Sequence, residues 1–133
     1  MAQEKTYVEV SILSLIASPD EDKGKSIIVE GVIDFIGDGV FLYATKDYYE
    51  SKVAKGRVNI KLNSIPNALC LSKGQFVRVF GDFNVIKGEL GYIEYLSIDD
   101  VTKIRILNSV IYPESHAEYG KGAIELFKGQ DCT

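Results

Sequence analysis

The stretch KGKSIIVEG at residues 23–31 returns as KGQFVRVFG at residues 73–81. Both copies begin with Lys-Gly and end with Gly. Both also place β-branched residues at the third and fifth positions after the first Gly, which are Ile27, Val29, Val77 and Val79. Alternation with a period of two between glycines is typical of a half-buried strand that enters and leaves bends. Two such strands, each starting a hairpin, predict a small curved sheet or barrel.

Turn residues divide the chain into five expected strands, over residues 25–36, 40–45, 57–63, 75–86 and 92–107. The Asp-Gly within residues 37–39 supports the positive φ of a tight hairpin turn, and residues 87–91 form a second hairpin loop bounded by glycines. Gly31 in mid-strand predicts a bend of the kind that barrel corners need. Asp99 and Asp100 indicate a bulge or turn in the last strand, and they are a poor acid–base pair because neighbours on a strand point to opposite faces.

The two repeated strands should each have one face toward the core. We expect the inward positions to be Ile27, Val29, Gly31, Ile33, Phe35, Val77, Val79, Gly81, Phe83 and Val85. The outward positions are then Ser26, Ile28, Glu30, Val32, Asp34, Phe76, Arg78, Phe80, Asp82 and Asn84. The inward residues of the two copies agree and the outward ones differ, so function should be sought on the outward side.

Short helical and irregular segments complete the expected organisation. Ser11 is a suitable N-cap for a helix whose apolar residues recur at spacings of three and four before Pro19 ends it. Residues 46–55 are expected to form a loop or helical turn, and residues 108–133 an extension packed partly on the strands. Within that extension, residues 123–128 fit one helical turn.

Composition limits the possible classes of function. The 133 residues, 46% of them hydrophobic, suffice for one core, and a net charge of −4 provides no general attraction for nucleic acid phosphates. The chain has no apolar run long enough to span a membrane, and residues 1–6 lack the apolar region of a signal peptide. These features predict a cytoplasmic protein, although an exported protein already trimmed of its leader would look the same.

The sequence offers little for catalysis. The single histidine is His116, and the two cysteines, Cys70 and Cys132, are far apart, so a closed zinc site would need carboxylate help. A disulfide between these cysteines is less expected than a buried Cys70 and a free thiol near the C-terminus. We therefore expect no enzyme, cofactor or metal. Catalysis through His116 remains a distant alternative.

Four pieces of sequence resemble a family of small bacterial proteins without established chemistry. They are VSILSLIASP at residues 10–19, the segments 24–31 and 74–83, and VTKI at residues 101–104. The resemblance extends over residues 8–106, although Asp22 and Lys23 replace an expected aromatic residue. It implies an OB-like barrel. The expected architecture is therefore mainly β: a five-stranded antiparallel OB-like barrel with one short N-terminal helix, residues 1–107, followed by the extension at residues 108–133.

Protein partners suit the acidic balance of the chain. Asp20, Glu21 and Asp22, beside Glu30 and Asp34, are expected to form an acidic edge. A polar segment adds Tyr48, Tyr49 and Glu50, and Tyr is a favoured residue at interfaces. An acidic surface with exposed Tyr would bind a partner with a basic surface quickly. By analogy of class, the hypothesis is an immunity or inhibitor protein that neutralises a bacterial toxin.

The alternative is an OB-type module for oligonucleotides or oligosaccharides. Phe76, Arg78 and Phe80 form an outward row of the aromatic and basic kind that binds single strands, and Arg57 and Lys61 could lie on the same sheet. The neighbouring acids Glu30, Asp34 and Asp82 and the net charge make nucleic acid the less favoured ligand. The helix or the C-terminal extension could instead cover both Phe rings.

Overall fold

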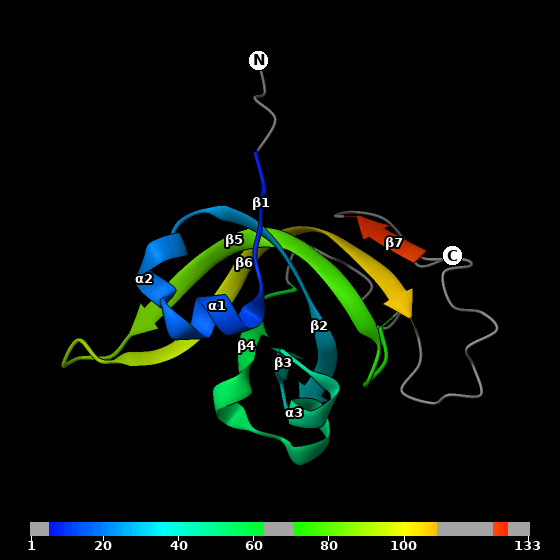
Figure 1. Ribbon diagram of the computed structural model, residues 1–133, viewed down its shortest axis with the longest axis horizontal. Helices are drawn as coiled ribbons and strands as arrows, with labels where there is room; N and C mark the ends of the chain where they lie inside the picture. Colours follow the sequence, from blue (N-terminus) through cyan, green and yellow to red (C-terminus); the bar gives the residue numbers. More distant parts are fainter. Residues whose placement is uncertain (1–5, 63–70, 109–123, 128–133) are drawn as a thin grey trace.

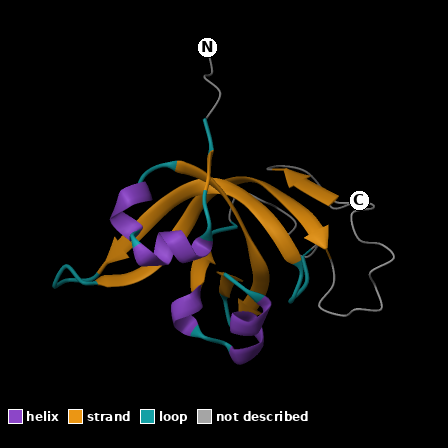
Figure 2. Cartoon of the chain, viewed as in Figure 1, coloured by secondary structure: helices purple, strands orange, loops and turns teal. Residues whose placement is uncertain are grey.

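The computed structural model describes residues 6–62, 71–108 and 124–127, and these residues are mainly β. Figure 1 shows a strongly curved sheet, and Figure 2 shows the short helices lying beside its strands. The elements in chain order are β1 (Val8–Glu9), α1 (Ile12–Ala17), α2 (Pro19–Asp22), β2 (Ser26–Ile36), β3 (Gly39–Tyr43), α3 (Lys46–Ser51), the 3-10 turn η1 (Ala54–Gly56), β4 (Arg57–Ile60), β5 (Phe76–Lys87), β6 (Ile93–Asn108) and β7 (Ile124–Phe127).

The strands pair in the order β1-β2-β3-β4-β6-β5, and β2 also pairs with β5, so the sheet curves into a partial ring. The pairs β1–β2 and β4–β6 are parallel and the others are antiparallel. The prediction of five antiparallel strands was therefore wrong in both number and direction. Parallel neighbours need a long connection, which α1 and α2 supply between β1 and β2, and which β5 and its flanking segments supply between β4 and β6.

The alternation in the repeated strands is confirmed by burial. Along β5 every second residue from Val77 to Val85 is buried, and the residues between them are partly exposed. In β2 the same pattern holds from Ile27 to Gly31, after which Val32 and Asp34 are buried as well. Both faces of β2 are covered there, because α3 packs over the outer face while the core fills the inner one.

Two glycines in the long strands lie at positions of close backbone approach. A Cβ at Gly31 would lie 2.5 Å from the Tyr43 carbonyl oxygen, and one at Gly81 would lie 2.8 Å from the Asp99 carbonyl oxygen. Asp100 has a φ of +46°, and the β5–β6 register shifts between Phe80 and Asp82. The last two observations confirm the bulge at Asp99–Asp100, and the close approach at Gly31 explains why glycine stands there.

The helices differ in part from expectation. Ser11 caps α1, its hydroxyl accepting a hydrogen bond from Ser14 N at 3.0 Å, and Ile12 and Leu15 enter the core. Pro19 ends α1 as predicted, but it also begins α2, because proline is tolerated at the first position of a helix. Residues 46–51 are helical as α3.

The C-terminal extension contributes a strand rather than a helical turn. Residues 124–127 form β7, which pairs antiparallel with β6 at residues 103–106. The prediction of a helical turn over residues 123–128 was therefore wrong. Four residues carry too weak a helical pattern to resist pairing with an available strand edge.

Candidate functional site

A groove of about 590 Å³ lies between β4 and the beginning of β6. Its first wall is Ile93–Leu96, and its second wall contains Phe41, Lys55, Arg57 and Asn59. Ile16 and Pro19, from α1 and α2, also line it. Apolar surface exceeds polar surface in the lining, as in most ligand sites.

The groove exists because two strands diverge. Among the described residues, β4 pairs with β6 at Asn59↔Ser97 and Ile60↔Ile98, at the C-terminal end of β4. Toward their beginnings the two strands separate, and β6 continues with β5 into a hairpin that projects from the sheet in Figure 1.

That hairpin tip exposes apolar side chains. Leu90 is 85% exposed and Tyr92 76%, and Ile93 and Tyr95 are each more than a third exposed. Exposed apolar residues gathered on one element mark interaction sites more often than single ones do. These residues were not among the predicted site residues, although Leu and Tyr beside the glycines of an expected hairpin loop were an available signal.

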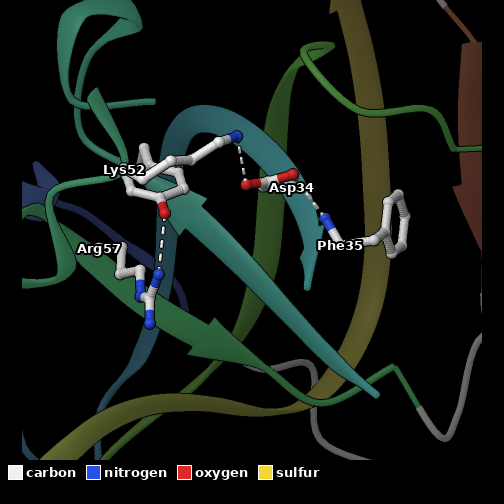
Figure 3. A network of polar contacts seen from close by, with 5 residues as sticks. Asp34, Phe35, Lys52 and Arg57 are labelled. Carbon is white, nitrogen blue, oxygen red and sulfur yellow. Dashed lines mark hydrogen bonds and ion pairs between the residues drawn. The ribbon is translucent and has the colours of Figure 1, made fainter. Parts of the chain in front are cut away.

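A network on the outer face of β2 and β3 leads toward the groove. Lys52 Nζ donates to Asp34 Oδ2 at 2.7 Å, and the backbone N–H of Phe35 donates to the other carboxylate oxygen at 2.9 Å (Figure 3). Lys52 also lies 3.9 Å from the centre of the Tyr49 ring, which packs edge-on against Tyr43. The helix α3 is thus fixed on the strands through a buried carboxylate.

Arg57 connects this network to the groove. Its guanidinium donates to Tyr43 Oη at 2.8 Å, and its Cζ lies 4.0 Å from the centre of the Phe41 ring. Both Phe41 and Arg57 line the groove. The second wall of the groove is therefore rigidly supported by residues beneath it.

The pKa of Lys52 is raised by its surroundings. Desolvation acts to lower this pKa, but the hydrogen bond that Lys52 donates to Asp34 and the negative charge of Asp34, helped by Tyr49 and Tyr43, outweigh that effect. Lys52 therefore stays protonated, and the ion pair persists, well into alkaline solution.

The expected acidic edge is not one surface. Asp34 is fully buried and paired with Lys52, so its assignment to a surface edge was wrong. Asp20, Glu21 and Asp22 lie on α2, where Asp22 pairs with Lys25 at 3.1 Å. Figure 1 shows α2 and α3 well apart. Asp34 occupies an outward position in the alternating pattern of β2, and it is buried only because α3 packs over that face.

The expected tyrosine segment lies on α3. Tyr48 packs against Gly56, since a Cβ at Gly56 would lie 2.3 Å from its ring, and Tyr49 packs against Tyr43. Glu50 remains on the surface, with Lys46 Nζ at 3.7 Å. Tyr48 is nevertheless 36% exposed, whereas Tyr49 is only partly exposed.

The Phe76–Arg78–Phe80 row is largely occupied from within the chain. Arg78 donates to Glu30 at 2.7 Å and to Glu9 at 3.3 Å, so its charge is neutralised. Tyr7 packs edge-on against Phe80 with ring centres 5.4 Å apart. Among the described residues, this cover comes from the N-terminal segment with β1, whereas the helix or the C-terminal extension was the expected cover.

No family model matches the chain, and no curated protein matches it.

Across residues 6–62, 71–108 and 124–127, no helix is both long and apolar enough to cross a membrane. Within that described part, no three His, Cys, Asp or Glu side chains gather as metal ligands. The residues His116, Cys70 and Cys132 lie outside it.

Proposed function

We propose that this protein is a non-catalytic binding module that recognises another protein through the groove and the β5–β6 hairpin tip. The observation that carries the proposal is the exposure of Leu90 and Tyr92 beside a mostly apolar groove. Aromatic and apolar residues next to a pocket are the usual anchors of a protein interface. A second wall that is already ordered favours affinity, because binding then costs less conformational entropy.

The proposed architecture behind this site is an OB-like barrel. The supporting observation is the cycle of pairings β2–β3–β4–β6–β5–β2, to which β1 and β7 are added. OB-type proteins bind their ligands over the second and third strands of the cycle and the adjoining hairpin loops. Here those elements are β3, β4 and the β5–β6 hairpin, which surround the groove.

We propose that this module acts as an immunity or inhibitor protein and that its partner is a toxin enzyme. The acidic residues of α2 follow Pro19, which lines the groove, so a partner with a basic surface would meet them at its rim. A gene for a toxin enzyme beside this one, and inhibition of that enzyme by the purified chain, would support this role. A neighbouring enzyme left fully active by an excess of the chain would contradict it.

A second candidate function is oligonucleotide or oligosaccharide binding in the same groove. The observation that favours it is the presence of Phe41 and Tyr95 together with Lys55 and Arg57. Aromatic rings with basic residues between them suit single strands. Arg57 is already engaged with Phe41 and Tyr43, however, and the chain carries a net charge of −4.

The test compares the wild-type chain with a Leu90→Ser/Tyr92→Ser variant. Both side chains are so exposed that the variant should unfold at the wild-type temperature. We expect it to lose a partner that the wild-type chain retains from native extract at low salt. Val8→Ser is the control, because Val8 is exposed outside the groove and should leave capture unchanged. Equal capture by all three chains would contradict the proposal, and salt-dependent binding of mixed-sequence single strands would favour the second candidate.

A further inference from the structure

We propose that the groove binds an amphipathic helix of the partner, with an apolar stripe that enters the groove, basic residues along one flank and acidic residues along the other. The inference rests on the proposed function and adds its binding mode and the chemistry of the ligand. In this mode a helix lays its apolar face into a groove, and side chains at spacings of three and four provide the anchors. Three features of the groove favour it.

The first feature is that both walls belong to strands that are already paired. β6 pairs with β5 at Ile93 and Tyr95, and with β4 at Ser97. β4 begins at Arg57 and pairs with β3 from this residue onward. Among the described residues, an extended peptide would thus find no row of backbone partners, and its N–H and C=O groups would lie unsatisfied against an apolar lining. A helix satisfies these groups internally.

The second feature is an apolar surface that continues beyond the groove. Ile16 of α1 lines the groove, and Leu13, which is half exposed, precedes it by three residues on the same helix. Residues three apart on a helix are neighbours, so Leu13 extends the apolar lining onto the surface of α1. On the other wall, Tyr92 and Leu90 extend it from Ile93 onto the hairpin. Such a surface suits several anchors of one helix better than a single side chain.

The third feature is a pair of opposite charges on the two walls. Lys55, in η1 before β4, and Glu94, in β6, both line the groove and are both exposed. Neither makes an ion pair with any described residue. Arg57 contributes less to the selection of a ligand, because it is already engaged with Tyr43 and Phe41.

These opposite charges select the flanks of the bound helix. An acidic residue beside the stripe would meet Lys55, and a basic residue on the other flank would meet Glu94. Positions beside an apolar stripe project to the two sides of a helix, so one helix can satisfy both walls at once. The acidic residues of α2 lie on the same side as Glu94, since Asp20 is 4.0 Å from Lys87, the strand neighbour of Ile93. The basic flank would face them as well.

The test begins with a phage library on a displayed helix of about 20 residues with randomised surface positions, selected on the full chain at low salt. We expect helices with an apolar stripe, with Lys or Arg along one flank and Asp or Glu along the other. Fluorescence polarisation then measures the affinity of the selected peptides. Proline at a solvent-facing position in the middle of the peptide should weaken binding more than about tenfold, whereas alanine there should change it less than about twofold.

Charge reversal tests the two walls separately. Lys55→Glu and Glu94→Lys should each weaken the selected peptides about fivefold, and reversing the charges on the facing flank of the peptide should restore the affinity. Both side chains are exposed, so these variants should unfold at the wild-type temperature. Lys73→Glu is the matched control, because Lys73 is exposed and lies outside the groove.

Several outcomes would overturn the bound helix. One is a selection without helical binders, and another is selected peptides that tolerate the central proline or bind both charge-reversal variants as tightly as wild type. Self-association that Leu90→Ser/Tyr92→Ser abolishes would place a second copy of the chain in the groove instead. If the natural partner is lost with Leu90→Ser/Tyr92→Ser, but is retained by Lys55→Glu and Glu94→Lys and is not displaced by the peptides, the proposed function stands and the bound helix is wrong.

Discussion

Asp34 and Lys52 form an ion pair of 2.7 Å in which the carboxylate is fully buried and the ammonium is half exposed. The pair joins β2 to the residue that ends α3, where Lys52 adopts a φ of +53°. The two partners differ in exposure. If Asp34 is lost, water can solvate the ammonium of Lys52, but if Lys52 is lost, the buried carboxylate of Asp34 has no access to water. Removing the partner of a buried charge therefore lowers the free energy of unfolding strongly, whatever the net contribution of the ion pair.

Lys52→Ala should therefore lower the free energy of unfolding by about 2–3 kcal/mol, since it leaves the buried carboxylate of Asp34 unpaired. Asp34→Asn should cost less, because it removes the buried charge itself. Lys46→Ala, at an exposed i,i+4 pair on the same helix, should change stability by less than about 0.5 kcal/mol. Urea unfolding of the three variants measures this order, and equal effects of the two lysine substitutions would contradict it.

The stability that Lys52 contributes should persist in alkaline solution. Its pKa is higher in the folded chain than in the unfolded one, so the contribution is complete below the ordinary lysine pKa and is lost as the pH rises through the raised value. The difference in unfolding free energy between wild type and Lys52→Ala should stay constant from pH 7 to about 9 and decrease only above that. A difference that does not decrease in more alkaline solution would show that the pKa is not raised.

Gly31→Ala should destabilise the fold by about 2–3 kcal/mol, because the added methyl group would press on the Tyr43 carbonyl, a backbone atom that cannot move aside. Gly88→Ala is the matched control. Its methyl group would meet only the flexible carboxylate of Glu94, and stability should stay within about 0.5 kcal/mol of wild type. Thermal unfolding compares the two variants, and a neutral Gly31→Ala would mean that β2 and β3 can separate without cost.

Tyr7→Ala should release β1 from the sheet. The Tyr7 ring packs on Phe80, and its hydroxyl lies 2.8 Å from Thr102 Oγ1. Hydrogen exchange at the Val10 amide, which donates to the Ile28 carbonyl at 3.0 Å, should become faster in this variant. Tyr7→Phe keeps the ring and should have a much smaller effect. Unchanged exchange in both variants would show that β1 is held by its backbone pairing alone.

Tyr49→Ala should lower stability by about 1–2 kcal/mol, because the ring contacts both Tyr43 and Lys52. Glu50→Lys should leave the unfolding temperature unchanged, since Glu50 is exposed and its contact with Lys46 is long. Calorimetry on the single variants separates the two. Should Tyr49→Ala prove as harmless as Glu50→Lys, Tyr49 would return to the set of available surface residues.

Features set by local pattern could be predicted from the sequence. The alternation of β5, the Ser11 cap and the bulge at Asp100 depend on a few neighbouring residues, and the structure contains all of them. β1 could not be predicted, because a strand of two residues carries no periodicity. The parallel β4–β6 pair depends on how the connections run, which local pattern does not specify.

The candidate site was harder to predict, since it depends on contacts between distant segments. Asp34 has the sequence position of a surface residue, and only the packing of α3 on β2 buries it. The groove results from the divergence of β4 and β6, and no single stretch of sequence encodes that divergence. Leu90 and Tyr92 are the exception, because apolar residues within a Gly-bounded turn can be recognised without a structure.

The pairing of β2 with β5 also has a consequence for how quickly the chain can reach its native state. Ser26 and Asp82, which are hydrogen-bonded across this pair, are 56 positions apart in the sequence. The chain must close a long loop before this contact stabilises anything, so the barrier to folding is largely entropic. We therefore expect refolding on the scale of about milliseconds to seconds. Relaxation within microseconds after a temperature jump would instead show that the loop between β2 and β5 closes after the rate-limiting step.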